Sequence, residues 1–106
     1  MNLLRYQQAD GKEPITTWLA GLRDVDAQVR VRMRLRRLEA GNFGDCHAVG
    51  DGVSELRIHT GPGYRVYFGR HGAATVLLLC GGDKSSQAAD IANAKVHWAD
   101  WKRRQP

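Results

Sequence analysis

Four side chains that can bind an anion or move a proton occur in one short stretch of the chain. They are Arg57, His59, Arg65 and Tyr67. Arginine stays protonated at physiological pH and can hold a phosphate group with two parallel donors. An imidazole transfers protons near neutral pH, because its unperturbed pKa is about 6.5. A surface that carried all four groups would suit an anionic ligand and acid–base chemistry.

The same stretch predicts the two strands that would bring these side chains together. Residues 54–59 and 64–68 each alternate apolar and polar positions, and this period of two is typical of a β-strand. Residues 60–63 contain two glycines that flank a proline, which favours a tight reversal. In such a hairpin the apolar positions face one side, namely Leu56, Ile58, Tyr64, Val66 and Phe68. The four polar groups then share the other side.

Length and composition indicate one globular domain with a basic surface. The chain has 106 residues, of which 42% are hydrophobic and 25% are charged, as is ordinary for a globular protein. A net charge of +5 suits nucleic acid or another polyanion as a partner. No apolar run is long enough for a transmembrane helix, and residues 1–14 lack the apolar region of a signal peptide. Cys46 and Cys80 have no metal-binding spacing, so we expect reduced thiols in a cytoplasmic protein with no metal and no membrane partner.

Residues 24–40 fit either a strand or a helix. Positions 29–36 alternate between apolar residues and arginines, but a stripe at helical spacing competes with this pattern: Ala27, Val31, Leu35 and Leu38. Asp24 can cap a helix, and the segment is longer than a typical strand, so we predict a helix. Its arginines could grip a polyanion, although we expect most of them to form a solvated face. Residues 41–52 are expected to form a loop, in which His47 is incidental.

The remaining segments complete an α+β domain. Residues 2–7 predict a strand at a sheet edge, and residues 75–80 predict a strand that is covered on both faces. Pro14 opens a short amphipathic helix. A last helix follows the break at residues 81–86 and docks by its apolar stripe. The expected order is strand, helix, helix, three antiparallel strands and helix, with the helices packed on one antiparallel-rich sheet.

Several sequence strings resemble one protein family closely. The most specific are ELRIH at residues 55–59, GPGYRVYF at residues 61–68 and LCGGDKS at residues 79–85. Residues 38–44 and 87–95 show the same resemblance. The chain resembles the phage-type addiction module killer protein branch of the RelE/ParE toxin superfamily, which is related to HigB. The resemblance covers nearly the whole chain and implies a single RelE-like, HigB-like toxin domain over residues 1–106.

The resemblance implies the toxin of a type II toxin–antitoxin system. The superfamily contains ribosome-dependent messenger-RNA endonucleases and poisons of DNA gyrase, and the motifs do not separate these targets. The first activity, which we favour, is cleavage of messenger RNA in the ribosomal A site by an enzyme without a metal or a cofactor. Its partners would be the ribosome, the message and a cognate antitoxin of helix-turn-helix type. The alternatives are a gyrase poison and a degenerate toxin that only binds its antitoxin.

The resemblance also implies which residues would act. Arg65 matches the arginine of the GYR motif, Arg57 the basic residue of the preceding strand, and Lys84 the basic residue that opens the last helix. Asp90 stands where RelE-like members often have a tyrosine, so Asp90 and His59 are candidate substitutes for the acid and the base. Four further residues are candidates for RNA contact: Tyr67, Tyr64, Arg34 and Arg37.

RNA cleavage by attack of the 2′-hydroxyl on the adjacent phosphate needs a base, an acid for the leaving 5′-oxygen, and cations for the phosphorane. The cations would be the two strand arginines and Lys84, with Arg65 foremost. His59 is the candidate for proton transfer, and Asp90 would be the base or would orient His59. In the alternative, structural interpretation, both arginines form ion pairs with Glu55.

Overall fold

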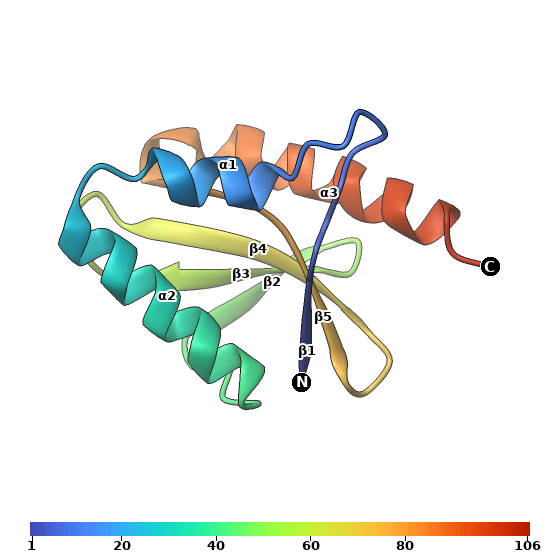
Figure 1. Ribbon diagram of the computed structural model, residues 1–106, viewed down its shortest axis with the longest axis horizontal. Coiled ribbons are helices and arrows are strands. Elements are labelled where there is room, and N and C mark those ends of the chain that lie inside the picture. Colours follow the sequence, from blue (N-terminus) through green and yellow to red (C-terminus); the bar gives the residue numbers. More distant parts are fainter.

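A five-stranded sheet with three helices makes up the computed structural model, which describes residues 1–106 (Figure 1). The strands are β1 (Asn2–Arg5), β2 (Cys46–Gly50), β3 (Val53–Ile58), β4 (Tyr64–His71) and β5 (Thr75–Asp83). The helices are α1 (Pro14–Gly21), α2 (Val25–Glu39) and α3 (Gln87–Arg103), and a 3-10 turn at Lys84–Ser86 leads into α3. The predicted α+β class is confirmed. None of the helices is both long and apolar enough to cross a membrane.

The sheet has the order β1–β5–β4–β3–β2, with β1 parallel to β5 and all other neighbours antiparallel. β1 lies at an edge, as the sequence predicts. β2 corrects the prediction of a loop over residues 41–52, because it pairs with β3 as the opposite edge strand. This strand is short, and its register shifts between Ala48 and Gly50, so its sequence shows no clear alternation. The antiparallel part of the sheet therefore has one strand more than predicted.

The helices lie on opposite faces of the sheet (Figure 1). α1 and α2 cover one face, where their apolar side chains join a cluster that contains Phe68 of β4. α3 covers the other face, where Trp98 belongs to a second cluster with Tyr67. β5 contributes side chains to both clusters: Val76 and Leu78 to the first, and Leu77, Leu79 and Cys80 to the second. The prediction that this strand is covered on both faces is confirmed.

The ambiguous segment forms a helix, α2. All four residues of the predicted apolar stripe are buried, namely Ala27, Val31, Leu35 and Leu38. The Asp24 carboxylate accepts hydrogen bonds from the backbone N–H groups of Asp26 and Ala27 and so caps the first turn. Four of its arginines are exposed: Arg30, Arg32, Arg36 and Arg37. The expected solvated face is confirmed for these four.

Two glycines carry β5 past its predicted end and let two helices approach it closely. The sequence predicts a break after Cys80, whereas the pairing of β5 with β4 continues through Asp83. A β-carbon on Gly81 would overlap the Trp18 ring of α1. A β-carbon on Gly82 would overlap the Asp90 carboxylate of α3. The position of both helices at this end of β5 therefore depends on the absence of two side chains.

Gly81→Ala is expected to lower the free energy of unfolding by about 1–3 kcal/mol, because the added methyl group overlaps an aromatic ring packed on the strand. The matched control is Gly21→Ala at the end of α1, where an added β-carbon meets no atom within 4 Å. There alanine should be neutral or stabilising, by at most about 1 kcal/mol. Urea denaturation measures both variants, and a wild-type midpoint for Gly81→Ala would contradict the steric account.

Candidate functional site

Two cross-strand pairs on the α3 face of the sheet form the centre of the candidate site. Glu55 lies opposite Tyr67, and Arg57 lies opposite Arg65. The predicted alternation is confirmed, because the apolar neighbours of these residues join the cluster under α1 and α2. Two arginines in direct opposition repel each other, which destabilises an isolated strand pair. Glu55 lies diagonally across from Arg65 and two residues before Arg57, so its carboxylate reaches both cations.

The Glu55 carboxylate is fully buried and has four polar partners. Its Oε1 accepts a hydrogen bond of 2.9 Å from Arg57 Nε and lies 3.3 Å from Arg65 Nε. Its Oε2 accepts hydrogen bonds of 2.9 Å from the Tyr67 hydroxyl and from the side-chain amide of Gln87 in α3. Burial would raise the pKa of Glu55, but the hydrogen bonds, that from Arg57 foremost, outweigh burial and lower the pKa. Glu55 is therefore an anion at neutral pH that holds two cations.

The two arginines differ in how much of the guanidinium remains for a ligand. The Arg57 side chain is 36% exposed, and only its Nε is bonded to Glu55, so its terminal nitrogens have no protein partner. The Arg65 side chain is 8% exposed, and its Nη1 donates to the Gly63 carbonyl oxygen at 3.2 Å. The buried Arg65 Nε has the Glu55 carboxylate nearby but is not aligned with it for a hydrogen bond. Arg57 is thus the better placed of the two for direct contact with a ligand.

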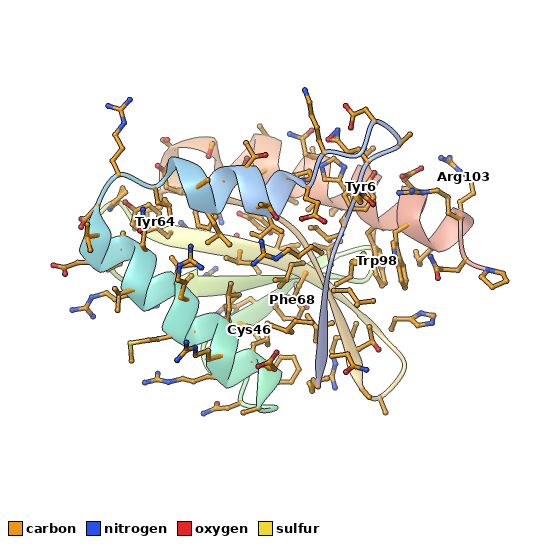
Figure 2. The ribbon with its side chains drawn as sticks, viewed as in Figure 1. Tyr6, Cys46, Tyr64, Phe68, Trp98 and Arg103 are labelled. Atoms are coloured by element: carbon orange, nitrogen blue, oxygen red, sulfur yellow. The ribbon has the colours of Figure 1, made fainter.

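A cavity of about 580 Å³ lies beside the arginines at the tip of the β3–β4 hairpin. Residues 57–65 and Lys84 line it. The cavity brings together four of the predicted catalytic residues: Arg57, His59, Arg65 and Lys84. Lys84 is exposed and makes no ion pair within the protein. Tyr64 also lines the cavity, and Figure 2 shows it at the end of the molecule opposite Trp98.

Tyr67 is not available for base stacking, and in this respect the prediction is wrong. Its side chain is fully buried in the cluster under α3, and its hydroxyl donates to Glu55. Burial, together with that hydrogen bond, raises the pKa of Tyr67, so the phenol stays protonated. Tyr64 is half-buried and packs edge-on against Trp18, with 6.1 Å between the ring centroids. Tyr64 remains the candidate for stacking on a base.

The hydrogen-bond partner of His59 is Asp45, which no sequence pattern singles out. The two are joined by a contact of 2.5 Å between His59 Nε2 and Asp45 Oδ2. His47 Nε2 lies 2.9 Å from the other oxygen of the same carboxylate. Asp90 instead accepts a hydrogen bond of 2.6 Å from the Ser86 hydroxyl and does not line the cavity. The structure therefore does not pair Asp90 with His59, because α3 places Asp90 over β5.

The two arginines of α2 that were candidates for RNA contact have different environments. Arg34 donates from Nη1 to the Arg57 carbonyl oxygen at 2.6 Å, and its Nη2 lies within 3.3 Å of the Phe43 carbonyl oxygen. These bonds use Arg34 to tie α2 to β3 and to the loop before β2. Arg37 is exposed and lines a second cavity of about 250 Å³. Of the two, only Arg37 keeps its guanidinium free for a partner.

The cysteines and the other common metal ligands form no site of their own. Cys80 is buried in the cluster under α3, and burial raises the pKa of its thiol to about 12. Such a thiol is protonated and inert at neutral pH. The structure therefore agrees with the packing role predicted for Cys80. Cys46 is half-buried and free, and no three His, Cys, Asp or Glu side chains are placed to hold a metal ion together.

Comparison with known proteins identifies a family. Residues 17–99 match the family described as "Phage derived protein Gp49-like (DUF891)". The chain belongs to the Gp49-like family. This Gp49-like chain is similar to a Haemophilus influenzae protein described as uncharacterized, and the two are 49% identical over 80 residues. Those residues cover 76% of this chain and 81% of that protein. The family match includes every candidate site residue, from Arg34 to Asp90.

Glu55→Gln is expected to destabilise the Gp49-like domain by about 3–5 kcal/mol at neutral pH, because it leaves the buried Arg65 without its counter-charge. The pKa of Glu55 is lower in the folded protein than its ordinary value of 4.5. Its carboxylate therefore contributes stability above that pH, and the contribution is lost as the pH falls through the folded pKa. The deficit of the variant should shrink on acidification.

Urea denaturation between neutral pH and about pH 3, the range that spans the carboxylate titration, measures this dependence. The matched control is Glu39→Gln, because Glu39 is exposed and its carboxylate has no partner. The control should change stability by less than about 0.5 kcal/mol. A deficit of Glu55→Gln that stays constant with pH would contradict the ionic role of the carboxylate.

Proposed function

We propose that this Gp49-like protein is the toxin of a type II toxin–antitoxin system and that it cuts messenger RNA in the ribosomal A site. Its membership of a phage-derived family supports the assignment to a toxin–antitoxin system. The strings ELRIH, GPGYRVYF and CGGDKS support the finer likeness to RelE-type and HigB-type toxins. The observation that carries the proposal is the cavity in which three cations meet one histidine.

The three cations would stabilise the charge that grows on the phosphate during attack. Arg57 offers two terminal nitrogens, a geometry that matches two phosphate oxygens. Lys84 offers an ammonium group on a flexible stem. Arg65 adds positive potential from beneath the surface. Because Glu55 is the only carboxylate bonded to the three cations, the lining of the cavity keeps an excess of positive charge before a substrate binds.

His59 would take the proton from the 2′-hydroxyl. The new bond joins the 2′-oxygen to phosphorus, and the bond from phosphorus to the 5′-oxygen breaks. The products are a 2′,3′-cyclic phosphate and a 5′-hydroxyl, without a metal in either step. The leaving 5′-oxygen needs a proton, for which we propose the Lys84 ammonium, because this group has no competing partner in the protein.

The ribosome would supply the alignment that the protein itself does not provide. The cavity lies at the surface, and His59 is the only histidine among the residues that line it. A site with so few groups for acid–base catalysis is effective when a larger assembly holds the reacting groups in place. The toxin would work in the cytoplasm. A cognate antitoxin would hold it inactive, and we propose that this antitoxin is a helix-turn-helix protein that covers the face of the sheet with Arg57 and Arg65.

The test is primer extension on a defined message incubated with purified protein, with and without translating ribosomes. Cuts that appear only with ribosomes, at a fixed position within codons, are the expected result. An intact message under both conditions, from a protein that still arrests growth, would overturn the proposal. A DNA supercoiling assay would then test DNA gyrase as the target. Overexpression without any growth arrest would indicate a protein that only binds its antitoxin.

Lys84→Ala is expected to reduce ribosome-dependent cleavage by about 100-fold or more, which is the usual effect of removing one group that stabilises charge in the transition state. Because Lys84 is exposed and unpaired, the thermal midpoint should stay at the wild-type value. The matched control is Lys12→Ala, which removes the same charge at an exposed position outside the cavity. Equal cleavage rates for the two variants would show that only net charge matters and would remove Lys84 from the site.

A further inference from the structure

A group of three titratable side chains is centred on Asp45, just before β2, and one of the three, His59, lines the cavity. The Asp45 carboxylate has a different histidine at each oxygen, with His59 Nε2 at 2.5 Å and His47 Nε2 at 2.9 Å. Partners on both oxygens hold the plane of the carboxylate in one orientation. Only His59 lines the cavity, so Asp45 lies directly behind the group that would move the proton.

The main chain of Asp45 is held as firmly as its side chain. The Arg57 backbone N–H donates to the Asp45 carbonyl oxygen at 3.0 Å, which ties this residue to β3. Arg34 of α2 donates to the same oxygen at 3.5 Å. The His59 side chain is 72% exposed and has no other hydrogen-bond partner in the protein. The orientation of the His59 ring is therefore set by Asp45.

The chemistry of the carboxylate fixes which ring nitrogen of His59 carries the proton. The hydrogen bond from His59, which outweighs the effect of burial, lowers the pKa of Asp45. An ionised carboxylate only accepts hydrogen bonds, so Nε2 must carry the hydrogen. In the neutral ring, Nδ1 then keeps the lone pair that can accept a proton.

We propose that Asp45 is the positioning residue of this site: it holds His59 in the tautomer whose Nδ1 acts as the base for the 2′-hydroxyl. The placement of the ring proton follows from the contact of His59 Nε2 with the ionised Asp45 carboxylate, and it does not depend on the proposed function. The effect on catalysis rests on the proposed function. An aspartate that orients an imidazole in this way acts through the histidine and need not touch the substrate.

The surroundings of His59 explain why a carboxylate is needed there. Apart from Tyr64, the other ionisable groups that line the two cavities bordered by His59 are lysine and arginine side chains: Arg57, Arg65, Lys84, Arg30, Arg34 and Arg37. Each cation opposes the imidazolium that forms when Nδ1 accepts a proton. Asp45 is the one carboxylate in contact with the ring, and its charge offsets this repulsion while the proton is held.

The test is Asp45→Asn, followed by two readouts. Nitrogen-15 NMR of the imidazoles should show the Nε2–H form of His59 in the wild type and both tautomers in the variant, because an amide donates as well as accepts. Ribosome-dependent cleavage should fall by about 100-fold through kcat, with KM for the message unchanged, as expected when proton transfer is impaired. A residue with a merely structural role would not change the tautomer.

The matched control is Asp51→Asn, which removes an exposed carboxylate paired with Lys95 at 3.7 Å. It should leave both the His59 tautomer and the cleavage rate as in the wild type. Wild-type cleavage and an unchanged tautomer in Asp45→Asn would overturn this inference while the proposed function stands. If the wild-type protein cuts no message, the proposed function fails and the catalytic role of Asp45 fails with it. The tautomer measurement would still decide whether Asp45 fixes the ring.

Discussion

One buried carboxylate sets the arrangement of the candidate site. Glu55 has no solvent contact, yet it stays ionised because four polar partners surround it. It allows Arg57 and Arg65 to lie opposite each other on neighbouring strands, where two cations would otherwise repel. A buried ion pair of this kind adds little to stability compared with an apolar core, but the loss of one partner is strongly destabilising. The ion pairs of Glu55 therefore fix the positions of the two arginines more than they stabilise the fold.

The same carboxylate links the site to the docking of the last helix. Glu55 lies on β3, accepts from Tyr67 on β4, and accepts from Gln87 in the first turn of α3. Lys84, the exposed cation of the cavity, lies in the turn that leads into this helix. Gly82, near the end of β5, lets α3 approach the strand closely at this point. The cavity is thus complete only when the hairpin and α3 are packed together, so folding and site assembly depend on the same contacts.

The sequence predicts much of this arrangement, and the failures have physical causes. Period-two alternation places Arg57 and Arg65 on one face, but it cannot show that α3 covers part of that face and buries Tyr67. The short, irregular β2 leaves no periodic signal, and Asp45 just before it is therefore missed as the partner of His59. The ion pairs with Glu55 are present, and they do not compete with a functional role. Arg57 binds Glu55 through Nε and keeps its outer nitrogens free.

The central claim is that the cavity beside Glu55 receives the phosphate that is cut. The most direct measurement is a structure of the protein on a translating ribosome whose message carries a 2′-O-methyl group at the cut codon, so that attack is blocked. The account predicts a message phosphate inside the cavity, within hydrogen-bond distance of the Arg57 terminal nitrogens and the Lys84 ammonium. A message that passes outside the cavity, with both cations in contact only with solvent, would contradict it.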